Sequence, residues 1–508
     1  MKVVLIHLKE NFTPAPPIGL LYVGTNLEKE GYNVWVFDTN PKEQDYIIKE
    51  VKKINPDLVG FSVMTTSYSI TKEFNKKLKE EVPGAYYFWG GVHASALPEQ
   101  TIVDNQLDFL VYGEGELTMV EVCRKLENKN KERNIWGVNL KGINGVYYVL
   151  DGKIEKNPPR CLIEDLDSLP IPNRSLLKNF QWYLSPPGFL RGKFYYGITT
   201  INASRGCPYQ CIFCASKIVH GSKVRRRSVK NVIKEMRYLK TGFGVRGIYF
   251  IDDTFATDIT WLKEFCLELK SSGLNMIWGC QTRANIAQEI NVLKIMKQGG
   301  CVQVDIGCES GSDKILINLK KGITTEMILK SFTNLKKLKL TTFATFILGN
   351  PEETTADIKK TEQIAKLTPG GVSFLILVPY PGSPLYQMAL TNNWFINKNV
   401  VFDEHWTNKQ SDVPVMAASL KVDDLIRIRA DLQNRFFFKN NKETILAFFK
   451  SPYFLFKALF TIIKHPIFIY QSLKKALKKK KSMDFLEDLY QKFNEDLRGA
   501  KNLSGNFR

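Results

Sequence analysis

Three cysteines, Cys207, Cys211 and Cys214, lie within eight residues of the segment "SRGCPYQCIFCAS". Thiolates this close together bind soft metals or iron–sulfur clusters, whereas disulfide exchange uses two cysteines. Structural zinc takes four ligands, usually as two short pairs, and the nearby sequence offers only His220 as a fourth. Three cysteines on a 4Fe–4S cluster leave one iron open to another ligand. We therefore interpret the segment as a cluster-binding loop.

After the cysteines, apolar strands that end in polar or glycine residues alternate with helical segments. This βα repeat predicts a complete or partial barrel over residues 194–395. The residues at four of the strand ends are Asp252, Asp253, Arg283, Glu309, Ser310 and Gly349. A single Asp after a strand is often a helix cap, and a single Gly is often a turn. Because barrel strands place their C-terminal ends on one face, the ordered set predicts a ligand site there.

Strands and helices also alternate from the apolar segment "KVVLIHL" at the start to about residue 150. This order predicts a Rossmann-like, doubly wound parallel sheet in residues 1–150, with its ligand at the loops beyond the strand C-termini. We place a proline-rich linker at residues 151–193 and a helical region at 396–508. The expected fold class is therefore α/β, with two successive sheets and a C-terminal helical region.

The spacing Cys-x3-Cys-x2-Cys, after a strand that opens a βα barrel, resembles the radical S-adenosylmethionine (SAM) enzymes over roughly residues 195–390. In that family the open iron of the 4Fe–4S cluster binds the amino and carboxylate groups of SAM, which is cleaved to a 5′-deoxyadenosyl radical. The resemblance implies these SAM contacts: Phe213 and Gly349 near the adenine, Asp252 and Asp253 at the ammonium, Glu309 and Ser310 at the ribose or carboxylate, and Arg283 at the carboxylate.

The first domain resembles the cobalamin-binding domain of the cobalamin-dependent radical SAM enzymes. The resemblance rests on the segments "PPIGLLYVGTNLEKEGYNVWVFD", "GFSVMTTS", "WGGVHASALPE" and "YGEGE". It implies cobalamin contacts at Ser62, Thr65, Thr66, Gly90, Gly91, His93, Gly113 and Glu114. The Asp-x-His-x-x-Gly motif that ligates cobalt is missing, because His7 lies inside the first strand. We favour cobalamin bound without a histidine ligand; a domain that keeps the fold without the cofactor is the alternative, and His93 also fits a buried structural role.

The two resemblances together imply methylation of an unactivated carbon, with an electron donor such as flavodoxin or ferredoxin. One SAM methylates cobalt, a second yields the radical, and the substrate radical takes the methyl group; no residue is identified as catalytic. A cyclase or oxidoreductase of the anaerobic porphyrin type is the alternative within the same architecture. A methylthiotransferase normally holds a second cluster, for which the first domain offers only Cys123, and a cobalamin sensor needs no cysteine triplet.

The net charge of +20 is concentrated near the end of the 508-residue chain, where residues 435–481 contain twelve Lys or Arg and one acid, Glu443. The segment predicts two amphipathic helices broken at Pro452 and Pro466, with lysines that interrupt every apolar run. Such helices suit an anionic membrane surface and a small-molecule, lipid or other hydrophobic substrate; a helical cap on the barrel is the alternative. We expect no nucleic-acid partner, no signal peptide and a cytoplasmic enzyme, peripheral at the membrane if the tail binds lipid.

Overall fold

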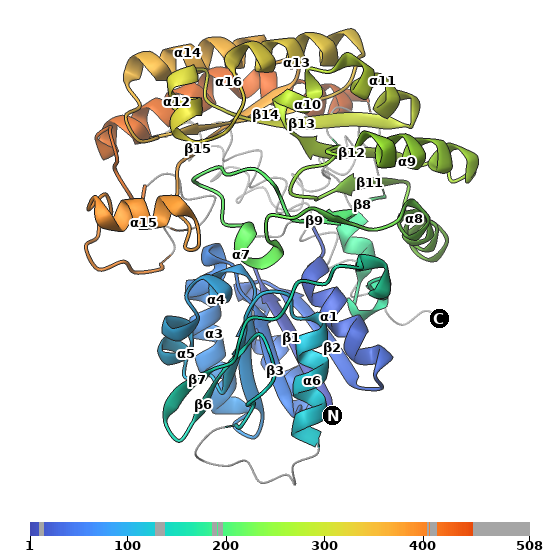
Figure 1. The fold of residues 1–508 in the computed structure, drawn as a ribbon, viewed down its shortest axis with the longest axis vertical. Helices are drawn as coiled ribbons and strands as arrows, with labels where there is room; N and C mark the ends of the chain where they lie inside the picture. Colours follow the sequence, from blue (N-terminus) through green and yellow to red (C-terminus); the bar gives the residue numbers. More distant parts are fainter. Residues whose placement is uncertain are drawn as a thin grey trace.

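The computed structural model describes residues 1–9, 15–127, 138–184, 190, 197–403, 406 and 414–450, without the side chains of 437, 438 and 441–450. Two sheets are arranged one above the other, the first built from the N-terminal residues and the second from residues 198–376 (Figure 1). The expected α/β fold class is confirmed.

The first sheet has seven strands in the order β2-β1-β3-β4-β5-β6-β7. Strands β1 to β5 pair in parallel, and the β6–β7 hairpin adds two antiparallel strands at one edge. Their bounds are β1 (Lys2–Leu8), β2 (Asn33–Thr39), β3 (Leu58–Ser62), β4 (Tyr86–Gly90), β5 (Phe109–Val111), β6 (Val146–Leu150) and β7 (Lys153–Lys156). The strand order reverses between β1 and β3, and doubly wound sheets bind ligands beside such a switch point.

Helices cover both faces of this sheet, as the burial of β1 illustrates. Val3 and Leu5 join the core formed with α1 and α6, whereas Val4 and Ile6 join the core formed with α2 and α3. A strand buried on both faces needs a continuous apolar run, which is what "KVVLIHL" supplies. The helices are α1 (Ile18–Lys29), α2 (Gln44–Ile54), α3 (Tyr68–Glu81), α4 (Val92–Ala96), α5 (Pro98–Asn105) and α6 (Glu116–Glu127).

The second sheet has six parallel strands in the order β15-β14-β13-β12-β11-β8, which follows the chain. Within the described residues β8 and β15 are its two edges, so the expected barrel is a partial one. The strands are β8 (Ile198–Ile201), β11 (Gly247–Phe250), β12 (Ile277–Thr282), β13 (Cys301–Glu309), β14 (Phe343–Leu348) and β15 (Gly371–Ile376).

Helices cover the outer face of the second sheet in Figure 1. They are α8 (Val229–Phe243), α9 (Ile259–Ser271), α10 (Ala284–Ala287), α11 (Ile290–Gln298), α12 (Asp313–Asn318), α13 (Thr325–Lys337), α14 (Thr355–Leu367) and α16 (Val422–Lys450). Helix α15 (Pro384–Thr391) instead lies on the side of the second sheet that is toward the first domain (Figure 1). A short two-stranded ladder, β9 (Ser204–Arg205) with β10 (Arg225–Arg226), and helix α7 (Lys217–His220) lie between the two sheets (Figure 1).

Helix α16 packs against the edge strand β15. The Asn440 amide group accepts a hydrogen bond from the Val372 N–H at 2.8 Å and donates one to the Val372 carbonyl at 2.7 Å. Arg429 Nε donates to the Phe374 carbonyl at 3.1 Å, and the Phe436 ring packs edge-on against Phe374. The first part of the C-terminal region is therefore a helical cap on the barrel. This contact satisfies backbone groups that an edge strand otherwise exposes.

The linker between the sheets is part of the protein core. Leu177, Phe180 and Tyr183 belong to one apolar cluster that extends from the first sheet to the helices of the second. Arg174, which is fully buried, donates to the Glu235 carboxylate of α8 at 2.8 Å. The domain boundaries at residues 150, 193 and 395 stay predictions; the β6–β7 hairpin that contains residues 151 and 152 belongs to the first sheet.

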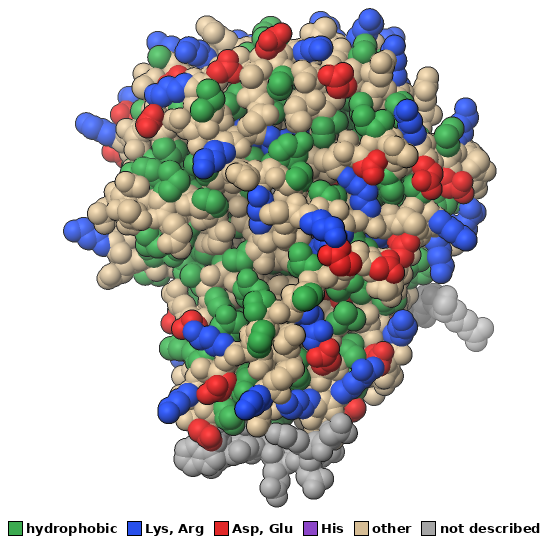
Figure 2. Space-filling model, in the orientation of Figure 1, with side chains coloured by type: hydrophobic (Ala, Val, Ile, Leu, Met, Phe, Trp, Pro, Cys, Tyr) green, Lys and Arg blue, Asp and Glu red, His purple; other side chains and the backbone are tan. Residues whose placement is uncertain are grey.

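Residues 435–450 of the predicted basic segment form the end of α16, whereas the residues from 451 on, with Pro452 and Pro466, lie outside the described residues. Membrane contact through residues 435–481 therefore stays a prediction. On the face shown in Figure 2, basic and acidic side chains are interspersed rather than gathered in a patch of one sign. Among the described helices none combines the length and the apolar character that a bilayer crossing requires.

One buried carboxyl group yields a prediction about pH and stability. Glu353, in the loop between β14 and α14, accepts hydrogen bonds from the N–H groups of Gly349 at 2.7 Å and Asn350 at 3.1 Å. Burial raises the pKa of the Glu353 carboxyl from 4.5 to about 7. The folded protein therefore keeps a proton that the unfolded chain loses between these pH values, and stability falls as the pH rises through that window.

We expect wild type to lose on the order of 3 kcal/mol of stability between pH 4.5 and 7 relative to Glu353→Gln, which cannot ionise. Anaerobic urea unfolding of the apoprotein, followed by tryptophan fluorescence at several pH values, measures the difference. Parallel pH profiles for the two proteins would show that Glu353 is ionised in the native state.

Candidate active site

The cysteine loop begins where β9 pairs with β10, Arg205 opposite Arg225. Gly206 follows with a φ of +91°, and a Cβ atom there would lie 2.2 Å from the Lys223 carbonyl oxygen, so only glycine fits. Further along, the Ile212 N–H donates to the Leu319 carbonyl at 3.1 Å, and the Ile212 carbonyl accepts from the Leu385 N–H at 2.8 Å. These contacts fix the backbone that carries the three thiols.

The three thiols are partly exposed and have different neighbours. Cys207 Sγ lies 3.6 Å from the Thr254 hydroxyl, Cys211 Sγ accepts from Arg283 Nη1 at 3.5 Å, and Cys214 Sγ lies 3.3 Å from the Ser216 hydroxyl. No group of three or more Cys, His, Asp or Glu side chains in the described part of the chain is arranged to hold a single metal ion. Three separate thiols with a guanidinium beside one of them suit the larger, anionic cluster better than zinc.

His220, the alternative zinc ligand, faces the first domain. Its Nδ1 lies 3.7 Å from Glu114 Oε1, too far for a hydrogen bond but close enough for an electrostatic contact. His7 is likewise engaged elsewhere, because its Nδ1 lies 2.8 Å from Asp38 Oδ1 on the neighbouring strand. Neither imidazole lies among the cysteines.

Arg283 is buried at the end of β12, with its guanidinium carbon 3.6 Å from the centre of the Tyr209 ring in the cysteine loop. Its Nε donates to Asn285 Oδ1 at 3.3 Å, whereas the buried Nη2 has no hydrogen-bond partner among the described groups. A buried guanidinium with a free donor beside a cluster loop fits an anionic ligand group. This geometry supports the predicted contact with the SAM carboxylate.

The adjacent acids Asp252 and Asp253 have different environments. Asp252 is buried and accepts hydrogen bonds from the Ala203 N–H at 2.8 Å and from the Ser204 hydroxyl, which ties the end of β11 to the start of the cysteine loop. Burial raises the pKa of the Asp252 carboxyl to about 6. Asp253 is exposed. Of the two, Asp253 is the one that is free to meet a bound ammonium group; a SAM role for either residue stays a prediction.

Glu309 and Ser310 also point to different neighbours. Glu309 has a φ of +63°, sits after a break in the β13–β14 register, and accepts from Lys321 Nζ at 2.6 Å in a buried ion pair. Lys321 Nζ lies 5.8 Å from the centre of the Phe213 ring. This strained turn brings Glu309 to the cysteine loop, in line with its predicted site role. Ser310 instead lies against Thr361 of α14, with the hydroxyls 3.3 Å apart.

Gly349, predicted near the adenine, has a φ of +83°. A Cβ atom at this position would lie 2.7 Å from Leu425 Cδ2 of α16. The absence of a side chain therefore lets α16 approach the barrel, which is a packing reason for the glycine. Its predicted contact with SAM is a separate hypothesis that this geometry leaves untested.

The predicted cobalamin residues gather along the C-terminal edge of the first sheet, beside its switch point. Ser62, Thr66, Gly90, Gly91 and Gly113 are partly exposed there, and the neighbouring Met64 is 44% exposed. A Cβ atom on Gly91 would lie 2.8 Å from the Val63 backbone, so glycine is needed where the loop after β4 crosses β3. This accessible edge fits a ligand laid across the strand ends.

His93 and Thr65, also predicted to contact cobalamin, are buried together. The His93 Nδ1 lies 3.1 Å from the Thr65 hydroxyl, and its ring packs against Tyr68 and Phe402. Burial lowers the pKa of His93 to about 3, so the imidazole is neutral. The structure thus supports the structural role that the sequence left open for His93.

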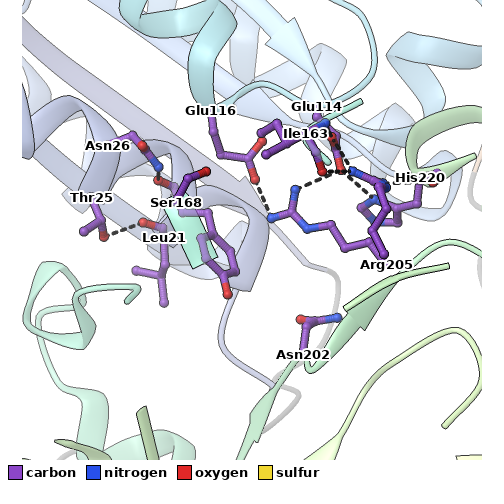
Figure 3. A network of polar contacts seen from close by, with 12 residues as sticks. Leu21, Thr25, Asn26, Glu114, Glu116, Ile163, Ser168, Asn202, Arg205 and His220 are labelled. Carbon is purple, nitrogen blue, oxygen red and sulfur yellow. Dashed lines mark hydrogen bonds and ion pairs between the residues drawn. The ribbon is translucent and has the colours of Figure 1, made fainter. Parts of the chain in front are cut away.

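Glu114, the last of the predicted cobalamin residues, makes its contacts with the second half of the chain. Its carboxylate accepts from Arg205 Nη1 and Arg225 Nη1, each at 3.0 Å, and Arg205 Nη2 donates to Glu116 at 2.6 Å (Figure 3). All four side chains are buried. The nearby His220, the hydrogen bond from Arg225, the charge of Arg205 and the hydrogen bond from the Ile163 N–H outweigh burial and hold the pKa of Glu114 below its usual range.

Sequence reasoning missed several residues of this site: Arg205, Tyr209, Glu116, Arg225, Thr254, Asn285 and Lys321. Arg205 directly precedes the Gly-Cys pair, and this position next to the cysteine loop could have identified it as a candidate site residue. Arg225 lies in the run "KVRRRS", which resembles an ordinary solvated basic segment. Lys321 has no local signal, because its partner Glu309 is twelve residues away and meets it only after β13 has turned.

Comparison with known proteins identifies the family. Residues 3–123 match a model described as the B12 binding domain, and residues 201–365 match the radical SAM superfamily. An uncharacterized methyltransferase of Pyrococcus horikoshii is 34% identical, over 80% of this chain and 83% of its own length. The chain belongs to the cobalamin-binding radical SAM proteins. The prediction of a cobalamin-dependent radical SAM enzyme, with a 4Fe–4S cluster, SAM and cobalamin as cofactors, is confirmed at the level of the family.

Other relatives of this cobalamin-binding radical SAM protein differ in their stated reactions. An anaerobic magnesium-protoporphyrin IX monomethyl ester cyclase of Rubrivivax gelatinosus is 27% identical, over 76% of this chain and 70% of its own length. The solved structure of the cobalamin-dependent SAM radical enzyme OxsB, with aqua-cobalamin and SAM bound, superimposes with a TM-score of 0.69 at 18% identity. That superposition covers all of this chain and 80% of OxsB, and it shows a shared fold.

The unpartnered Nη2 of Arg283 leads to a prediction about SAM affinity. Lysine keeps the charge but loses the planar fork that binds a carboxylate with two hydrogen bonds. We expect Arg283→Lys to bind SAM at least roughly tenfold more weakly than wild type, with an unchanged iron content. Equilibrium dialysis of SAM against the reconstituted protein measures this. Arg124→Lys, at an exposed pair with Glu30, is the matched control. Wild-type affinity in Arg283→Lys would exclude the carboxylate contact.

Proposed function

We propose that this radical SAM protein methylates an unactivated carbon of a small-molecule substrate. When bound, the cluster and SAM supply hydrogen-atom abstraction and cobalamin supplies the methyl group. The observation that carries the proposal is the contact between the two ligand edges, because the loop after β8 holds the cysteines and packs on the loops after β4 and β5. A reaction that uses both cofactors on one substrate requires them side by side.

In this proposal the chain binds and orients its cofactors. Cys207, Cys211 and Cys214 hold the cluster, Arg283 and Asp253 bind the charged groups of SAM, and the edge beside Ser62 holds cobalamin. Lys321 pairs with Glu309 and keeps that buried carboxylate in place, while the Lys321 ammonium itself lies near the Phe213 ring. We further propose a flavodoxin or ferredoxin as the electron source.

A cyclase or oxidoreductase is the second candidate, supported by the porphyrin cyclase relative. Such an enzyme cleaves SAM without passing its methyl group to a substrate. The higher identity and broader coverage of the methyltransferase relative favour methylation. The two reactions differ in their SAM-derived products: S-adenosylhomocysteine accompanies methyl transfer, and 5′-deoxyadenosine accompanies hydrogen abstraction.

The test uses anaerobic protein reconstituted with iron, sulfide and hydroxocobalamin, then desalted and incubated with SAM and titanium(III) citrate. We expect roughly four irons and about one cobalt per chain. We also expect S-adenosylhomocysteine that forms only when cobalamin is present. Retained cobalt with 5′-deoxyadenosine and no S-adenosylhomocysteine would favour the second candidate. Four irons without retained cobalt would exclude cobalamin-dependent methylation. Cys211→Ala is the control for cluster dependence.

A hydrophobic substrate and peripheral membrane binding are proposals that rest on the basic tail alone. We expect the full chain to sediment with vesicles that contain phosphatidylserine, but not with phosphatidylcholine vesicles. Each lysine near an anionic surface contributes about 1 kcal/mol, so replacing the four lysines at 478–481 with glutamine should weaken binding by roughly a thousandfold. Replacing the exposed Lys52 and Lys53 with glutamine is the control. Equal binding to both vesicle types would contradict the membrane proposal.

A further inference from the structure

Buried ion pairs connect the cysteine loop to the ligand edge of the first sheet. We propose that Glu114 and Glu116 are positioning residues that make cluster binding and cobalamin binding cooperative, through Arg205 and Arg225. The inference rests on the proposed pair of cofactors, and it concerns how binding of one cofactor changes the affinity for the other.

The first observation is where the arginines lie. Arg205 is two residues before Cys207, and Arg225 is paired with it across the β9–β10 ladder. Both guanidinium groups are therefore attached to the base of the cysteine loop. A shift of that base as the loop closes on a cluster must move both groups.

The second observation is how tightly the carboxylates hold them. Glu114 accepts from Arg205 and Arg225 at 3.0 Å and from the Ile163 N–H at 2.8 Å, while Arg205 Nη2 donates to Glu116 at 2.6 Å (Figure 3). The two arginines and two glutamates balance in charge. Each is at most 6% exposed, so none can exchange its partner for water. If one of these side chains moves, its partner is left as an unpaired buried charge, which is strongly unfavourable. The four side chains therefore keep a single arrangement.

The third observation is what the carboxylates are attached to. Glu114 follows Gly113, whose N–H donates to the Ser95 hydroxyl at 3.0 Å. Ser95 belongs to α4, the helix that begins immediately after Gly91. The loops after β4 and β5, which form the predicted cobalamin edge, are thus joined to each other and then to the arginines.

The other end of the cysteine loop reaches the same edge. Helix α7 begins three residues after Cys214, and its Ile218 lies beside Gly382, as does Ala96 at the end of α4. His220 closes α7 and lies 3.7 Å from Glu114. Both flanks of the cluster loop therefore rest on the two loops expected to hold cobalamin. A cofactor that orders either side lowers the cost of ordering the other.

The test compares the affinity for hydroxocobalamin in the full-length apoprotein and in the same protein reconstituted with the cluster. Absorbance titration under anaerobic conditions gives both dissociation constants without any turnover. We expect the cluster to tighten cobalamin binding about tenfold in wild type. By reciprocity, cobalamin should stabilise the cluster against a chelator by the same factor.

Glu116→Gln removes one buried charge from a residue that is outside the predicted cobalamin contacts. We expect it to bring the ratio of the two dissociation constants close to one, with the cluster still formed. Arg205→Lys keeps the charge but loses one of the two contacts, and it should give an intermediate ratio. Glu99→Gln, at an exposed pair with Lys156, should keep the wild-type ratio.

Phe265→Leu, in the buried core of α9, separates loss of stability from loss of coupling. It should lower the unfolding midpoint and leave the ratio of dissociation constants unchanged. A wild-type ratio of one, or the same ratio in wild type and Glu116→Gln, would overturn the proposal. Absence of cobalamin binding in both states would overturn the proposed function as well, whereas a ratio above one without S-adenosylhomocysteine formation would overturn methylation alone.

Discussion

The buried contact of Arg205 with Glu114 and Glu116 is the constraint that fixes how the cysteine loop packs on the strand ends of the first sheet. Buried ion pairs add little net stability compared with apolar packing, but breaking one leaves a charge stranded at a cost of roughly 3–5 kcal/mol. Such a contact therefore selects one docking geometry and penalises all others. It acts at the residue that leads into the cysteines, so it fixes the loop that carries the three thiols rather than a distant surface.

The surrounding core reinforces that geometry. One apolar cluster continues from α1 and α6 through Leu177 and Phe180 of the linker to the helices of the partial barrel. On the opposite side of the first sheet, Tyr386 and Phe402 of the chain after β15 pack into the second cluster. The two halves of the chain are thus joined by apolar packing on both faces of the first sheet. At the edge strand β15, Asn440 bonds to the backbone in place of another strand.

The fold could be predicted from the sequence because its signals are local. "KVVLIHL" is a continuous apolar run, and the β6–β7 hairpin has a Gly in its turn with φ > 0. Cys207, Cys211 and Cys214 were found for the same reason, since their spacing lies within one loop. The contacts of Glu114 were not predictable, because its partners are 91 and 111 residues away. "YGEGE" shows an acidic loop, but nothing in it shows that the second sheet supplies the countercharge.

The direction in which a side chain points after a strand also could not be predicted from the sequence, as two pairs of adjacent residues show. Asp252 and Asp253 are equivalent in sequence, yet one closes onto Ala203 and the other is exposed, since adjacent residues after a strand point in different directions. Glu309 and Ser310 divide in the same way between Lys321 and Thr361. The residue type at a strand end predicts which kind of group it can bind. The direction in which its side chain points depends on the turn that follows the strand.

The continuous core and the shared charge network have a consequence for how such chains diversify. The first domain of this chain is not an independent module, because its loop after β5 carries half of a four-residue charge set whose other half lies beside the cysteines. A recombination point at the linker would separate Glu114 from Arg225 and cut the apolar cluster at Leu177. The two halves of this chain are therefore expected to tolerate substitution together better than replacement of either half alone.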